Sequence, residues 1–194
     1  MTRNKIGIFG GSFNPVHKGH IIIAEGFIKA FDLDLLYVIP NYISPFKKEL
    51  EVSGDDRAEM LRIAFSGNQK IVIGDMELKR GGTSYTCDTI AEIKAIHEKS
   101  DLFLLIGDDH AKSFLRWKNF QFILENATLV IATREGKDVT DGVKSIEETA
   151  NVKVELLENQ PFECSSTDFR AQPNADSLPD GVFEYIKKRG LYGL

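Results

Sequence analysis

The feature that most constrains the fold is a short apolar strand that runs through two glycines into an amphipathic helix near the amino terminus. The strand is expected at residues 5–9, and Gly10 and Gly11 follow it directly. Glycine tolerates positive φ and lets a ligand approach the main chain closely. Because the next helix opens with unpaired N–H groups and the positive end of its dipole, this corner is typical of a phosphate site at the carboxyl edge of a sheet.

Two histidines, His17 and His20, stand at the opening of that helix. Residues i and i+3 are neighbours on a helix, so both imidazoles project from the same face of the first turn. The same spacing also suits a metal ion, but the sequence offers no obvious third ligand nearby. We therefore predict phosphate chemistry beside these histidines and no metal ion held by protein ligands.

Apolar strands alternate with helices along almost the whole chain. The alternation predicts one α/β domain over residues 1–194, a Rossmann-like, doubly wound parallel sheet with helices on both faces and right-handed crossovers. Further strands are expected at residues 35–39, 70–73, 102–106, 128–132 and 152–156, with residues 76–78 extending the third strand at its edge. Helices are expected at residues 56–65, 86–97 and 179–189, and Gly54 and Asp55 are the expected cap of the first of these.

The overall composition excludes several classes of protein. The 194 residues carry a net charge of −5, with ordinary fractions of charged (27%) and hydrophobic (42%) residues. A net negative charge argues against nucleic acid or an anionic membrane as the main partner, because both attract proteins that carry an excess of positive charge. Two cysteines without metal or redox spacing, and a start free of any long apolar run, predict a cytoplasmic protein. The sequence leaves open whether it forms a homo-oligomer.

Loops that follow strands should meet the histidine turn at the carboxyl edge of the sheet. The loop after the second strand delivers Lys47 as a mobile charge for phosphate. A glycine-rich loop then enters the helix at residue 86, where Ser84 and Thr86 both suit a cap and the free N–H groups suit an anion.

Two later segments complete the expected site. The fourth strand ends in acidic residues suited to ribose hydroxyls, and Trp117 follows between Arg116 and Lys118, well placed to stack on a flat ring. Near the end of the chain, a run of hydroxyl residues caps a helix one turn before Arg170. Such an arginine can hold the same anion as the N–H groups of the cap.

Taken together, these motifs resemble those of the bacterial nicotinate mononucleotide adenylyltransferases, members of the nucleotidyltransferase superfamily. The motifs lie, in order, at residues 10–13 with 17–20, 44–47, 82–86 with 88–89, 107–109 with Trp117, and 165–170. The resemblance implies that ATP and nicotinate mononucleotide are the substrates, that deamido-NAD and pyrophosphate are the products, and that Mg²⁺ accompanies ATP. The chain departs from the family pattern at Asn14 (usually Asp), Lys18 (often Asn) and Phe46 (usually His).

The resemblance also implies roles for individual residues. His17, His20 and Arg170 would be catalytic, with His20 nearest the α-phosphate; Thr86 would receive the nicotinate carboxylate and Trp117 would stack on its ring. The residues that would bind ATP are Gly10, Gly11, Ser12, Phe13, His17, His20, Gly107, Asp109, Ser165, Ser166, Thr167 and Arg170. The residues that would bind nicotinate mononucleotide are Ser12, Phe13, Lys47, Ser84, Tyr85, Thr86, Asp109, Trp117 and Lys118.

Three alternatives stay open. An adenylyltransferase for nicotinamide mononucleotide or pantetheine phosphate would share the histidines but make less use of Thr86 and Trp117. A noncatalytic nucleotide-binding regulator would bind ATP without releasing pyrophosphate, and the full set of His17, His20 and Arg170 argues against it. A nucleic-acid-binding module is disfavoured by the acidic balance and by the absence of a basic aromatic stripe.

Overall fold

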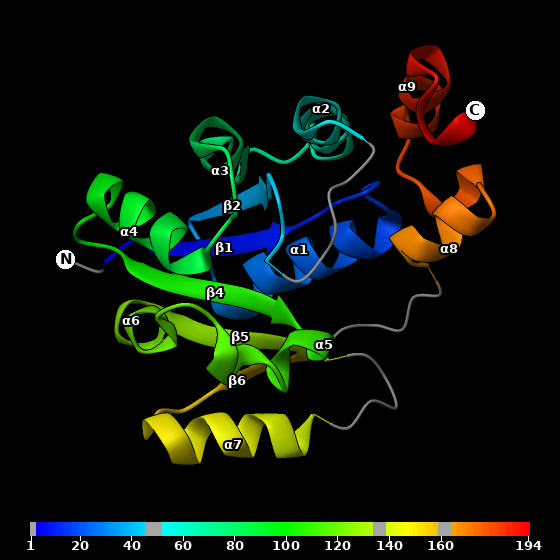
Figure 1. The fold of residues 1–194 in the computed structure, drawn as a ribbon. Helices are drawn as coiled ribbons and strands as arrows, with labels where there is room; N and C mark the ends of the chain where they lie inside the picture. The colour runs from blue at the N-terminus through cyan, green and yellow to red at the C-terminus, as the bar shows by residue number, and fades with distance from the viewer. Residues whose placement is uncertain (1–2, 46–51, 134–138, 159–163) are drawn as a thin grey trace.

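A computed structural model describes residues 3–45, 52–133, 139–158 and 164–194 (Figure 1). The six strands form one parallel sheet in the order β3-β2-β1-β4-β5-β6. The strands are β1 (Lys5–Gly11), β2 (Leu35–Pro40), β3 (Ile71–Ile73), β4 (Asp101–Gly107), β5 (Thr128–Thr133) and β6 (Glu155–Glu158). The strands β2 and β3 are added on one side of β1, and β4, β5 and β6 are added on its other side. The strand order therefore reverses between β1 and β4, which is where parallel sheets of this kind open a crevice for ligands.

Helices cover both faces of the sheet, as the alternation predicts. Successive strand residues point to opposite faces, so Phe9 belongs to one apolar cluster and Ile8 to the other. The first cluster packs under α1 (Lys18–Phe31), α2 (Gly54–Ala64) and α9 (Val182–Arg189). The second packs under α4 (Thr86–Ile96), α6 (Phe120–Asn126) and α7 (Thr140–Ala150).

Short helical segments supply much of the chain at the carboxyl edge of the sheet, the edge at which all the strands end. They are α3 (Met76–Arg80), α5 (Asp108–Ala111), η1 (Phe114–Arg116), α8 (Ser166–Ala171), η2 (Ala175–Ser177) and η3 (Leu191–Gly193). In Figure 1 the tip of β4 points toward α5, and the orange and red segments of α8 and α9 stand beyond the tip of β1. Ser166, Arg170 and Tyr192 from these segments contact the turn just before α1.

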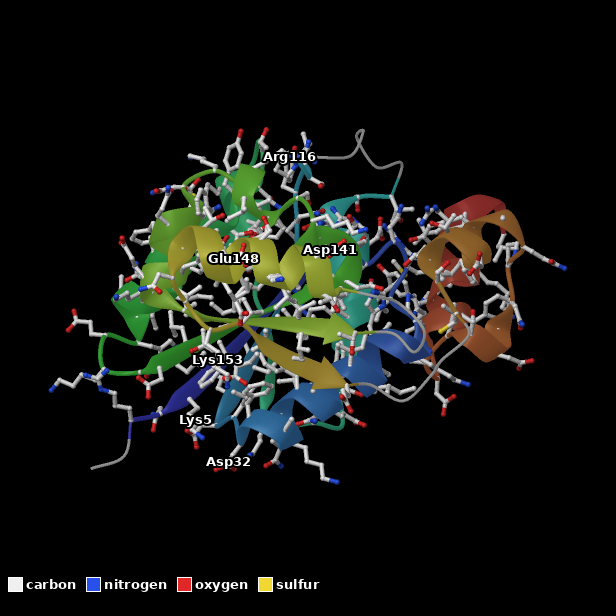
Figure 2. All side chains as sticks on the ribbon, turned by 90° about the horizontal axis from the view of Figure 1, so that it is seen from below. Lys5, Asp32, Arg116, Asp141, Glu148 and Lys153 are labelled. Atoms are coloured by element: carbon white, nitrogen blue, oxygen red, sulfur yellow. The ribbon has the colours of Figure 1, made fainter. Side chains whose placement is uncertain are left out.

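The helices are amphipathic, as α7 illustrates (Figure 2). Asp141 and Glu148 are exposed along its outer side, whereas Ile146 is completely buried against the sheet. None of the helices in the described part of the chain is both long enough and apolar enough to span a bilayer.

The structure corrects several local predictions. Residues 76–78 belong to helix α3 and do not extend β3, because Gly74 ends the pairing and Asp75 then accepts the backbone N–H of Lys79 at 2.9 Å. Three residues of alternating polarity are too few to distinguish a strand from a helical turn. The last strand begins at Glu155 and the last helix at Val182, both three residues later than predicted.

Two caps also differ from prediction. The side chain of Ser53, one residue before the predicted cap, accepts the N–H of Asp56 at 3.0 Å and caps α2. Neither Ser84 nor Thr86 caps α4, since the N-cap is Tyr85 and the Ser84 hydroxyl accepts the backbone N–H of Tyr42 at 2.9 Å. That bond ties the loop after β2 to the loop before α4.

Candidate functional site

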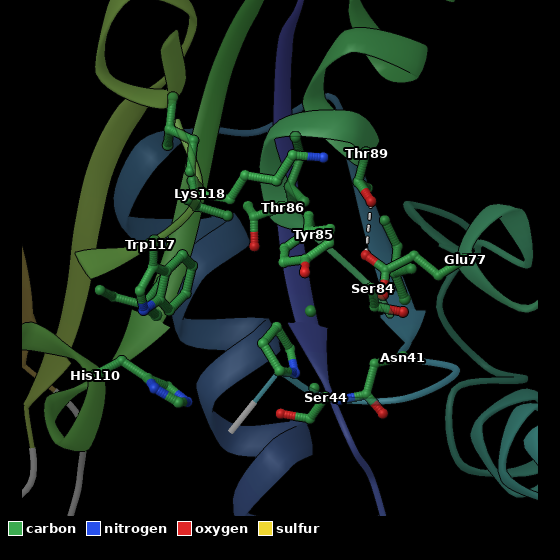
Figure 3. A pocket seen from close by; sticks show the side chains of 18 of the residues that line it. Asn41, Ser44, Glu77, Ser84, Tyr85, Thr86, Thr89, His110, Trp117 and Lys118 are labelled. Carbon is green, nitrogen blue, oxygen red and sulfur yellow. Dashed lines mark hydrogen bonds between the residues drawn. The ribbon is translucent and has the colours of Figure 1, made fainter. Parts of the chain in front are cut away.

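A cavity of about 310 Å³ opens at the carboxyl ends of β1 and β4 (Figure 3). Its lining brings together eight of the predicted site residues: Gly10, Gly11, Ser84, Tyr85, Thr86, Gly107, Trp117 and Lys118. A Cβ built on Gly10 would meet no atom within 4 Å, so the main chain is open to a close-lying ligand there. The glycine turn and the aromatic residues, far apart in sequence, thus share one cavity.

The indole of Trp117 forms one wall of the cavity (Figure 3). It packs against the Phe114 ring at a centroid distance of 5.3 Å and edge-on against His110 at 5.5 Å. Phe114 is completely buried, so the core holds the indole from behind. Trp117 is therefore both anchored in the apolar cluster and presented to the cavity.

The opposite wall is the start of α4, where Tyr85 and Thr86 face the cavity (Figure 3). The first N–H groups of a helix have no partner within it and carry the positive end of the helix dipole. Lys118 lies over the Tyr85 ring at 4.4 Å and pairs with Asp88 at 3.1 Å. The ion pair joins the segment that carries Trp117 to the first turn of α4.

A buried polar cluster lies at the end of the cavity opposite Trp117. The Glu77 carboxylate, 7% exposed, accepts the hydroxyl of Thr89 at 2.6 Å. Arg80 donates to the same hydroxyl oxygen at 3.3 Å and pairs with Glu92 at 2.8 Å. Burial raises the pKa of the Glu77 carboxyl, although the hydrogen bonds from Thr89 and Ser84 oppose the rise.

The two histidines meet at the start of α1, with ring centroids 3.7 Å apart. The backbone N–H of His17 donates to Nδ1 of His20 at 3.1 Å, so a neutral His20 ring carries its proton on Nε2. Phe13 lies edge-on against His20 at 5.0 Å and is 2% exposed, with φ at 45°. The buried Phe13 side chain packs against the His20 ring and supports the histidine turn.

The hydroxyl run near the end of the chain forms α8 beside the histidine turn. Ser165 caps this helix by accepting the N–H of Asp168 at 3.1 Å, as predicted. Cys164, just before it, lies with Sγ 3.4 Å from Nδ1 of His17. Arg170 donates to the carbonyl oxygen of Asn14 at 2.6 Å and to the hydroxyl of Thr167 at 3.2 Å. The guanidinium therefore braces the turn before His17.

The remaining predicted residues lie around these two groups. Ser12 connects them, since its hydroxyl accepts the side-chain amide of Asn41, a cavity residue, at 3.3 Å. Asp109 is exposed, and its Oδ1 lies 2.6 Å from the position that a Cβ on Gly107 would take. A side chain at position 107 would therefore displace this carboxylate. Lys47 and Phe46 lie outside the described residues.

The structure adds cavity residues that the motifs did not single out as binding residues: Asn41, Ser44, Glu77, His110 and Arg116. Four of them stand in loops that the sequence did mark. The sequence pattern does not mark Glu77, because residues 76–78 are predicted as a strand extension and form helix α3. Among the described residues, no group of three or more His, Cys, Asp or Glu side chains could hold a metal ion.

Residues 8–172 match the cytidylyltransferase-like family, and the chain belongs to it. Its fold agrees with solved structures of Plasmodium falciparum nicotinic acid mononucleotide adenylyltransferase. The complex with NaAD gives a TM-score of 0.79 at 20% identity, with 98% of each chain covered. The complex with APC gives a TM-score of 0.77, also at 20% identity and with 98% of each chain covered.

Closer relatives in sequence define the group within that family. The chain is 33% identical over 98% of its length to a probable nicotinate-nucleotide adenylyltransferase of Clavibacter michiganensis subsp. michiganensis, of which it covers 94%. It is 34% identical over 97% of its length to a probable enzyme of the same name from Geobacillus thermodenitrificans, covering 86% of that protein. A Dictyoglomus thermophilum protein of this name is 32% identical, with 97% and 99% of the two chains covered. The predicted family, a group of nucleotidyltransferases, is thus confirmed.

Proposed function

We propose that the protein transfers the adenylyl group of ATP to nicotinate mononucleotide, giving deamido-NAD and pyrophosphate. The observation that carries the proposal is the cavity between Trp117 and the first turn of α4, which opens next to the glycine turn and Ser12. A flat ring fits the indole wall, and an anion fits the opposite wall. A phosphate on the same molecule would then reach toward the histidine turn.

In this proposal the pyridine ring of nicotinate mononucleotide stacks on Trp117, and its carboxylate accepts N–H groups at Thr86. Two cations, Arg116 and Lys118, line the same cavity and favour an acid over an amide. Glu77 stands at the far end of the cavity, where burial raises the pKa of its carboxyl. The acid–amide choice would thus be made by the N–H donors at the start of α4 together with the positive charges of Arg116 and Lys118.

ATP would bind across the glycine turn, with its phosphates between the two histidines and the hydroxyls of α8. Nε2 of His20 donates to the α-phosphate in this arrangement, and Arg170 turns from Thr167 to the phosphate tail. Gly107 and Asp109 lie at the tip of β4, where ribose hydroxyls would be bound. Mg²⁺ would be held by the phosphates themselves and would neutralise their charge.

The chemistry needs no nucleophilic side chain. A phosphate oxygen of nicotinate mononucleotide attacks the α-phosphorus, the new P–O bond forms, and the bond to the bridging oxygen of pyrophosphate breaks. The protein would align the two phosphates and stabilise the charge that develops on the α-phosphate. No proton transfer is required, because the attacking phosphate is already an anion.

The test measures pyrophosphate release from Mg²⁺–ATP with nicotinate mononucleotide, nicotinamide mononucleotide and pantetheine phosphate under identical conditions. Nicotinamide would point NH₂ donors at N–H donors and lose the charge, so kcat/KM should favour the acid by at least about 10²-fold. Equal rates or a preference for the amide would refute the assignment of the carboxylate site. Pyrophosphate release with pantetheine phosphate alone would show that the protein is an adenylyltransferase for that substrate. ATP binding without pyrophosphate release would indicate a noncatalytic regulator.

A further inference from the structure

The turn that leads into His17 is held by side chains from distant parts of the chain. The carbonyl of Ser12 accepts a hydrogen bond from Arg57 at 2.8 Å and that of Asn14 accepts one from Arg170 at 2.6 Å. The carbonyl of Pro15 accepts the hydroxyl of Ser166 at 2.8 Å. Each of these bonds orients one peptide group of the turn.

One further bond holds a side chain of this turn. The hydroxyl of Tyr192 donates to Oδ1 of Asn14 at 2.7 Å, across 178 positions of sequence. Asn14 is 7% exposed, so water does not replace this donor easily. The Tyr192 ring lies edge-on against the buried Phe169, with centroids 5.6 Å apart.

The backbone is strained at Tyr192, the residue that donates to Asn14. Its φ is 57° and its ψ is 24°, a left-handed conformation that a tyrosine adopts at some cost in energy. Burial raises the pKa of its hydroxyl, which stays protonated and able to donate. Tyr192 therefore presents a protonated hydroxyl to the buried side-chain amide of Asn14.

The main chain between Asn14 and His17 connects the Tyr192–Asn14 hydrogen bond to the orientation of the His20 ring. The N–H of His17 belongs to the peptide group directly after the one that carries the Pro15 carbonyl, and it donates to Nδ1 of His20 and orients that ring. A rotation of the peptides at Asn14 and Pro15 would turn this N–H and the imidazole with it. A shift of about 1 Å in such a group is enough to lower a rate by up to about 10²-fold.

We infer that Tyr192 is a positioning residue for the proposed adenylyl transfer: its bond to Asn14 fixes the turn that aligns His17 and His20. The inference rests on the proposed function for its kinetic consequence only. The contact itself also predicts a change in the ligand-free protein, which can be measured without any substrate.

The experiment compares Tyr192→Phe with a matched control, Tyr185→Phe. Tyr185 also belongs to the last segment of the chain, but its hydroxyl donates to Asp56 on α2 at 2.9 Å and does not touch the turn. Tyr192→Phe should lower kcat by about tenfold or more while the KM values for both substrates change by less than about threefold. Tyr185→Phe should lower Tm by a similar amount and leave kcat unchanged.

Two changes at the other end of the bond complete the test. Asn14→Asp keeps an acceptor for the tyrosine hydroxyl and should retain most of the activity, whereas Asn14→Leu should match Tyr192→Phe. The double variant of Tyr192→Phe with Asn14→Leu should be no slower than either single variant, because both remove the same interaction. Additive losses would overturn the inference.

A substrate-free measurement separates this inference from the proposed function. The imidazole ¹⁵N resonances of His17 and His20 should shift in Tyr192→Phe and stay in place in Tyr185→Phe. If these signals do not move, or if both phenylalanine variants lose activity in proportion to their Tm, Tyr192 has a structural role only. If the wild-type protein releases no pyrophosphate while the signals do shift, the proposed reaction is wrong and the positioning contact stands.

Discussion

Replacing Arg57 should destabilise the protein far more than replacing any surface arginine. The Arg57 side chain is 2% exposed and donates to three backbone carbonyls, those of Ser12 at 2.8 Å, Asn41 at 2.7 Å and Val52 at 3.3 Å. These carbonyls belong to the loops after β1 and β2 and to the segment before α2. One guanidinium thus holds three separate stretches of chain that surround the candidate site.

The magnitude follows from the bonds that Arg57→Met would remove. A hydrogen bond to a charged group contributes about 1.5–3 kcal/mol, and two of the three bonds are short. Recovered hydration of the removed charge offsets part of this loss, which leaves a destabilisation of about 3 kcal/mol. For a domain of this size, that corresponds to a fall in Tm of about 6–12 °C.

Urea unfolding and thermal melting at neutral pH measure this loss. Arg62→Met is the matched control, because Arg62 lies on the same helix, is half exposed and pairs with the exposed Glu59 at 3.0 Å. The control should lose less than about 0.5 kcal/mol. Arg57→Lys should fall between the two, since a single ammonium cannot reach all three carbonyls. A loss below about 1 kcal/mol for Arg57→Met, or one equal to the control, would refute the reasoning.

Three further predictions concern the site. His20→Ala should lower kcat by about 10²-fold with the fold intact by circular dichroism, because a contact made in the transition state contributes roughly 3 kcal/mol; near-full activity would remove His20 from the mechanism. Trp117→Ala should raise the KM for nicotinate mononucleotide by about fivefold or more, while Trp117→Phe should keep much of the stacking. A rise in the KM for ATP alone would show that the indole packs in the core and does not stack on the pyridine ring. Glu77→Gln tests a pH effect. Because the pKa of the Glu77 carboxyl is raised in the folded protein, this carboxyl deprotonates at a lower pH in the unfolded chain than in the folded protein. The free energy of unfolding of the wild type should therefore fall relative to that of Glu77→Gln as pH rises from about 4 to 7. Urea unfolding at both pH values measures the difference, and a difference that stays constant would show that Glu77 titrates normally.

Local sequence patterns determined the sheet and the composition of much of the site. Continuous apolar character over β1 and β4 is visible in the residues themselves, because burial of a strand on both faces selects that pattern. The glycine turn, the histidine pair and the Ser165 cap are equally local, since each depends on the preferences of a few adjacent residues. These signals predict a site at the carboxyl edge of the sheet, where the structure has the cavity lined by Gly10, Thr86 and Trp117.

The tertiary structure alone decided which distant groups meet. Arg57 stands on a helix among charged residues and reads as a surface side chain, yet it is buried because the loops after β1 and β2 close over it. Tyr192 contacts Asn14 across nearly the whole chain. The helix α3 replaced a predicted strand extension because Gly74 and Asp75 turn the chain away from the sheet. Periodicity reports which face of an element is apolar, but not which loop or terminus will supply the donor that a buried carbonyl needs. That choice depends on how all the elements pack, and it is made only when the chain has folded.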